Sequence, residues 1–147
     1  MKTDLDYLKQ MLMPFLETDK ACIKLKDLED KGIRIHSEIE PNRIDDKFSH
    51  HVSLLVENRL ISNRDLETGN LKAIGIQFGM NGHLVMNPKE LRLTQQGIDF
   101  ANMLENNEVL TRLKSDFKNM TFEVIFDAGK TIISALAKQK LQSLNLG

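Results

Sequence analysis

Apolar side chains recur at helical spacing from the start of this chain. Thr3 and Asp4 are residue types that cap helices well, and the apolar set that follows them is Leu5, Leu8, Leu12, Phe15 and Leu16. This spacing predicts an N-terminal helix. Pro14 has no amide hydrogen and its ring clashes with the preceding turn, so we expect the helix to kink or stop near Met13. A short second helix is predicted over residues 25–30, with Gly32 placed to end it.

The clearest helical pattern of the first half runs from Asn42 to Arg59. Asn42 precedes Asp45 by three residues, an arrangement similar to a capping box. The apolar residues of this segment share one face, and they are Ile44, Phe48, Val52 and Leu55. We expect that face to turn toward the core and the opposite, polar face to remain in solvent.

Beyond Ile61 the pattern changes to alternation. Residues 71–78 alternate, and the larger side chains of one predicted strand face are Lys72, Ile74, Ile76 and Phe78. Residues 79–82 predict a hairpin turn, residues 83–86 a returning strand, and residues 91–93 another short strand. Thr94 is the predicted cap of a helix whose core face is Gly97, Phe100, Ala101 and Leu104. Helices over residues 108–117 and 121–144 complete the pattern.

The order helix, helix, helix, hairpin, helix is typical of a winged-helix domain. The predicted fold class is therefore α+β, with a winged helix-turn-helix core, a small antiparallel hairpin and a helical C-terminal extension. Residues 1–105 would form the winged-helix-like domain. Residues 106–147 would form the extension, packing on that domain or on a second copy of the chain.

Composition narrows the function classes. The 147 residues carry a net charge of −1 and one cysteine, so an internal disulfide is impossible and a simple charge-driven affinity for nucleic acid is not expected. Residues 111–147, with six basic and three acidic side chains, hold the only basic excess. We find neither an apolar run long enough for a membrane span nor a signal peptide, which predicts a cytoplasmic protein.

Three segments of the chain carry a resemblance to a known family. They are residues 1–6, then His51 with Leu54 and Leu55, and then Arg92-Leu93-Thr94 with Gly97 and Phe100. On these segments the chain resembles the uncharacterised bacterial and prophage family called domain of unknown function 2513, although that family usually has Trp where Gln95 stands and lacks Pro14. The resemblance implies a small winged-helix-like protein, and with it a regulator associated with a phage or mobile element.

No motif of enzymatic chemistry is present. His50 and His51 are adjacent, so a helix turns them roughly 100° apart and they do not suit one metal ion. We expect His51 to be packed and hydrogen-bonded and His50 to be exposed. Cys22 has no neighbouring motif that would activate it, and the glycines at 75, 79 and 82 do not form a phosphate loop. We therefore expect no catalytic residue, no metal and no cofactor.

The polar face of the helix from Asn42 predicts contacts with double-stranded DNA. Its side chains include types that bond to phosphates or base edges, and the hairpin adds more. The predicted DNA-binding set is Arg43, Lys47, His50, Ser53, Asn58, Lys72, Asn81, His83 and Lys89. Asp46 and Glu57 lie on the same face and would repel phosphates. A continuous positive surface over Arg43, Lys47, Lys72 and Lys89 would favour DNA, and alternating charges would favour a protein partner.

The last predicted helix is apolar around more of its circumference than one core contact requires. It therefore packs either on the N-terminal helix alone or, on another side, against a second copy as a two-fold dimer. The predicted dimer residues are Phe122, Ile125, Phe126, Ile132, Ile133 and Leu136. A protein-interaction module without enzymatic activity is thus the alternative to a DNA-binding regulator.

Overall fold

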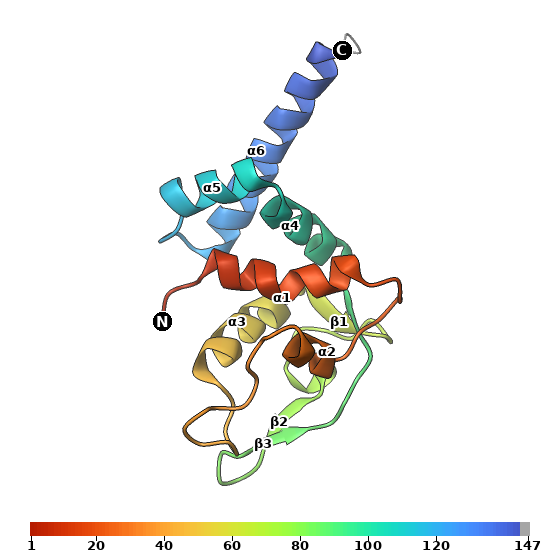
Figure 1. Cartoon of the computed structure of the whole chain (residues 1–147), viewed down its shortest axis with the longest axis vertical. Helices are drawn as coiled ribbons and strands as arrows, with labels where there is room; N and C mark the ends of the chain where they lie inside the picture. The colour runs from red at the N-terminus through yellow and green to blue at the C-terminus, as the bar shows by residue number, and fades with distance from the viewer. Residues whose placement is uncertain (145–147) are drawn as a thin grey trace.

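The computed structural model describes residues 1–144, which fold into a mixed α+β structure (Figure 1). This confirms the α+β class, while the winged helix-turn-helix core stays a prediction. The last three residues of the predicted extension lie outside the described residues. In chain order the elements are α1 (Leu5–Glu17), α2 (Leu25–Asp30), α3 (Asp46–Glu57), β1 (Ile61–Asn63), the 3₁₀ helix η1 (Lys72–Ile74), β2 (Ile76–Phe78), β3 (Leu84–Met86), β4 (Leu91–Leu93), α4 (Gln95–Glu105), α5 (Asn107–Asp116) and α6 (Phe122–Ser143).

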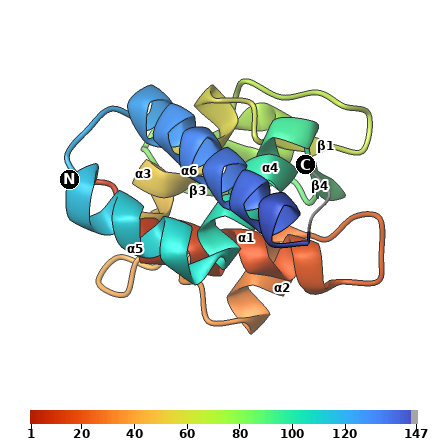
Figure 2. The same ribbon diagram turned by 90° about the horizontal axis from the view of Figure 1, so that it is seen from above.

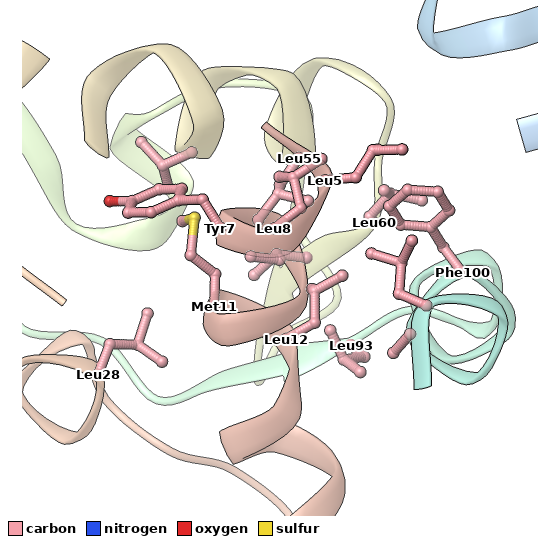
Figure 3. Packing of buried hydrophobic residues seen from close by; sticks show 14 of the residues in the cluster. Leu5, Tyr7, Leu8, Met11, Leu12, Leu28, Leu55, Leu60, Leu93 and Phe100 are labelled. Carbon is pink, nitrogen blue, oxygen red and sulfur yellow. The ribbon is translucent and has the colours of Figure 1, made fainter. Parts of the chain in front are cut away.

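Helix α1 runs through the middle of the core. Asp4 caps it by accepting a hydrogen bond from the Tyr7 amide, and Leu8, Met11 and Leu12 are fully buried. Figure 3 shows these side chains between α3, which contributes Leu55, and α4, which contributes Phe100. Of the two outcomes predicted near Met13, a kink or a stop, the stop does not occur, because α1 continues to Glu17 with Pro14 inside it. Phe15 and Leu16 pack against the core after the proline and so stabilise the last turn.

A small sheet joins three distant segments. Strand β1 pairs antiparallel with β4, placing Ile61 opposite Leu93 and Asn63 opposite Leu91. On the other edge of β4, Leu91 also forms a bridge with Ile23, which lies between α1 and α2. Strand β1 was not predicted, because three buried residues in a row show no alternation.

The predicted long strand over residues 71–78 is wrong in its first half. Residues 72–74 form η1, started by Asn70, whose side chain accepts a hydrogen bond from the Ala73 amide. Gly75 follows with φ +90, a conformation open to glycine, and a Cβ there would lie 2.1 Å from the Asn87 carbonyl oxygen. Only β2 and β3 form the hairpin, and Phe78 is 47% exposed instead of buried.

Helix α3 begins later than predicted. An antiparallel bridge between His36 and Ile44, with a hydrogen bond from the Asp45 amide to the Ile35 carbonyl, holds the residues before Asp46 in an extended path. The cap is therefore Asp45, which accepts from the Phe48 amide, and not Asn42. The expected core face is confirmed, because Phe48, Val52 and Leu55 are fully buried.

Helices α4, α5 and α6 form the other side of the core. Thr94 caps α4 as predicted, and Phe100 of α4 packs against Phe122 and Phe126 of α6, with ring centroids 5.0 and 5.8 Å away. Helix α6 crosses over α4 (Figure 2) and its second half then extends beyond the rest of the structure (Figure 1). We call this part, residues 133–144, the outer arm.

Candidate interaction surfaces

His51 links the N-terminal end of α1 to α3. Its Nδ1 donates to the Lys47 carbonyl oxygen at 2.7 Å, and its Nε2 accepts from the Asp4 amide at 2.9 Å. Burial lowers the pKa of His51 below its ordinary value, which keeps the ring neutral as this pair of hydrogen bonds requires. His51 is therefore a structural histidine, as expected, and not a free ligand.

Lys47 also makes contacts within the chain. Its Nζ lies 3.0 Å from Asp4 Oδ2 and 4.9 Å from the centroid of the Tyr7 ring. Burial of Tyr7, with Asp45 and Asp4 nearby, raises the pKa of its hydroxyl to about 12. Partial burial opposes ionisation of Asp4, but hydrogen bonds from the Tyr7 amide and Lys47 hold the pKa of Asp4 below its ordinary value. These charges stabilise the contact between α1 and α3.

The remaining predicted residues of α3 are only partly accessible. His50 is half-buried and not exposed as predicted, because it packs edge-on against His51 with ring centroids 4.9 Å apart. Its Nε2 is buried without a hydrogen-bond partner among residues 1–144. Ser53 is half-buried, and the Asn58 side chain donates to the Leu54 carbonyl oxygen at 2.8 Å. Asn58 therefore caps the C-terminal end of α3, and this cap uses one N–H donor of its side chain.

The hairpin tip gathers Arg43, Asn81 and His83 of the predicted polar residues. Arg43, which precedes α3, donates to the Asn81 carbonyl oxygen at 3.3 Å, and the Asn81 side chain bonds to His83 at 3.0 Å. Arg43 also forms an ion pair with Glu40 at 3.2 Å. Lys72 and Lys89 are exposed and form no ion pair with any residue that the structure describes.

The charges on this surface alternate in sign. Arg43 is paired with Glu40 and Lys47 with Asp4, while Asp46 and Glu57 are exposed on α3. Two of the four cations expected to form a positive surface, Arg43 and Lys47, therefore each have a carboxylate beside them.

The predicted dimer residues divide into three groups along α6. Ile125 and Ile132 are only 1% and 9% exposed, so they belong to the core of their own chain and cannot contact a second copy. Phe122 and Phe126 are half-buried against Phe100. Only Ile133 and Leu136 lie on the outer arm.

The outer arm also carries apolar residues that the sequence interpretation missed. Leu141 and Leu144 are 47% and 56% exposed, and no residue of the arm is buried. The sequence did contain a signal for these two leucines. They follow Ile133 by eight and eleven residues, a spacing that places all three near one face of the helix. Where α6 leaves the core, a groove of about 300 Å³ lies between α4 and α6, lined by Asp99, Met103 and Ile133 among others.

Neither a metal-binding cluster nor a membrane-spanning helix occurs among residues 1–144. No group of three or more His, Cys, Asp or Glu side chains is placed to hold a metal ion there. No helix in that range combines the length and apolar character needed to cross a membrane.

Comparisons with family models, with curated proteins and with solved structures found no match to this chain. The resemblance to the uncharacterised prophage family therefore stays a prediction.

Proposed function

We propose that this chain is a protein-interaction module that forms a homodimer through the outer arm of α6. The observation that carries the proposal is a helical segment of about three turns with exposed leucines and no buried residue. In the single chain the arm packs on the core only at its start, through Ile133 and Leu136, so its last turns depend on local helix propensity. Burial of Leu141 and Leu144 in a partner would stabilise these turns.

Charge favours a second copy as that partner. The arm contains Lys138 and Lys140 and no acidic residue, whereas Asp99 lines the groove between α4 and α6. A two-fold antiparallel crossing between Thr131 and Ser134 would bring Lys138 of each copy close to Asp127 of the other, because these two residues are eleven apart and share one face of α6. Ser134, Ala135 and Ala137 are small, which allows two helices to approach closely at the crossing.

The dimer is tested by sedimentation equilibrium over a wide range of protein concentration. The double variant Leu141→Lys with Leu144→Lys should fold normally, because both side chains are already exposed in the single chain. Each buried leucine contributes roughly 1.5–3 kcal/mol, so the variant should raise the dimer dissociation constant about a hundredfold or more.

Val85→Lys is the matched control. Val85 is also exposed, at 47%, but it lies on β3, away from α6. This control should dimerise like the natural chain. A natural chain that stays monomeric at all concentrations, or a control that dissociates as strongly as the double variant, would refute the proposal.

DNA binding is the second candidate function, supported by the connections of the elements. The order α1, Ile23 bridge, α2, α3, β1, hairpin and β4, with Ile23 and β1 on either side of β4, is the order of a winged helix. In such a domain α3 would enter the major groove and the hairpin would touch the backbone. This support is an analogy of fold, which does not by itself establish a function.

The structure limits how strongly DNA could be bound. Among residues 1–144, Lys72 and Lys89 form no ion pair, Arg43 pairs with Glu40, and Lys47 pairs with Asp4. With about three cations per chain, the logarithm of affinity should fall with the logarithm of salt concentration with a slope of about −3 per chain.

Fluorescence anisotropy with mixed-sequence duplexes at about 50 mM salt tests this candidate. Lys72→Ala with Lys89→Ala should weaken binding, and Lys118→Ala, on the loop after α5, is the control. Absence of binding at low salt would rule the candidate out without affecting the dimer proposal.

A further inference from the structure

An open pocket lies beside the C-terminal end of α1, between α1, the residues before α2, β4 and the start of α4. Its volume is about 530 Å³, within the range of pockets that bind small molecules. Phe15 and Leu16 of α1, Ile23, and Ile98 of α4 form its apolar wall, and Cys22 lies among them. This wall suits a hydrocarbon group.

Two arginines complete the lining of this pocket. Arg92 is the middle residue of β4 and is exposed, while its neighbours Leu91 and Leu93 are buried. Arg64 follows β1 directly and is also exposed, so the pairing of β1 with β4 brings both arginines to one pocket. Their guanidinium groups can each offer two parallel N–H donors, the arrangement that matches a carboxylate.

Neither arginine is neutralised within residues 1–144. The ion pairs of the described chain involve other cations, and the only hydrogen bond of the Arg92 side chain is a long one, 3.4 Å from its Nε to the Leu93 carbonyl oxygen. The nearby Glu90 pairs with Lys24 instead. An apolar pocket with two unpaired cations is complementary to a ligand with a hydrocarbon body and one negative end.

We propose that this pocket binds a small aliphatic carboxylate. Arg64 and Arg92 hold the carboxylate, and the apolar wall from Phe15 to Ile98 covers the hydrocarbon chain. The site is separate from both the outer arm and the hairpin tip, so it does not depend on the proposed dimer or on DNA binding.

Octanoate is the probe, and titration calorimetry on the full chain measures its affinity. Octanol, which has the same chain length without the charge, should bind at least tenfold more weakly. The double variant Arg64→Leu with Arg92→Leu should reduce octanoate affinity about tenfold or more, while leaving octanol affinity nearly unchanged. Arg112→Leu on α5 removes an arginine outside the pocket and should change neither.

Cys22 reports where the ligand binds. It is the only cysteine of the chain and is partly exposed in the pocket wall, so reaction with a neutral maleimide measures access to this place alone. Saturating octanoate should slow the reaction severalfold in the natural chain and in Arg112→Leu.

Two results would overturn the proposal. One is the absence of measurable octanoate binding by the natural chain. The other is equal octanoate affinity in the natural chain and in the Arg64 and Arg92 double variant, which would show that octanoate adsorbs elsewhere. Circular dichroism and thermal unfolding of each variant verify that a loss of affinity does not come from a loss of fold.

Discussion

Two helical glycines give a sharp test of how α4 packs against the sheet. A Cβ added at Gly97 would lie 2.0 Å from the Leu60 carbonyl oxygen and 3.3 Å from the Leu93 Cβ. That carbonyl cannot move freely, because it also accepts a hydrogen bond from the Thr94 amide at 2.9 Å. A Cβ at Gly129 would instead lie 2.7 Å from the Met103 sulfur, which is the far end of a flexible side chain.

These contacts predict that the same substitution lowers stability much more at Gly97 than at Gly129. Overpacking costs roughly 1–3 kcal/mol, and contact with a fixed backbone atom belongs at the upper end of that range. Alanine regains about 1 kcal/mol of helix propensity relative to glycine. Gly97→Ala should therefore lower the free energy of unfolding by roughly 2 kcal/mol, whereas Gly129→Ala should stay within about 1 kcal/mol of the natural chain.

Urea unfolding followed by circular dichroism measures both variants. The denaturant dependence should be unchanged, so that the shift in midpoint reports stability alone. Gly97→Ala as stable as the natural chain, or a larger loss in Gly129→Ala, would show that α4 does not approach β1 and β4 as described.

Three further predictions follow from single side chains. Asn63→Ala removes four hydrogen bonds to residues 65–73 from a buried position, so it should cost roughly 2–4 kcal/mol in urea unfolding and speed hydrogen exchange around η1. Burial lowers the pKa of His51, so its contribution to stability is complete above its ordinary value of 6.5 and decreases as the pH falls below that value. The melting temperature should therefore fall between about pH 7.5 and 5.5, and His51→Phe should show a smaller fall. Thr94→Ala loses the cap of α4 and should cost about 1 kcal/mol, measured by thermal unfolding.

The helices could be predicted from the sequence because their signals are local. Spacing identified the core face of α3, and Thr94 and Gly97 marked the start of α4. The first turn of α3 was misplaced, because the bridge from His36 to Ile44 competes with the cap at Asn42. Such a bridge depends on how a loop folds back on itself, which spacing along the chain does not reveal.

The surfaces could be predicted much less well than the helices. Lys47 faces solvent as expected, but its ion pair with Asp4, which lies far from it in the sequence, could not be predicted. Arg64 and Arg92 come together only through the pairing of β1 with β4, and β1 has no alternating pattern. Long-range contacts of this kind require the tertiary structure.

The most direct test of the central claim, that a second copy covers the outer arm of α6, is amide hydrogen exchange at two protein concentrations. The account predicts slow exchange over residues 133–143 at high concentration, where the dimer is populated, and fast exchange at low concentration. Core amides such as those of Leu8 and Val52 should exchange equally slowly at both concentrations. Fast exchange of the arm at both concentrations would contradict the claim.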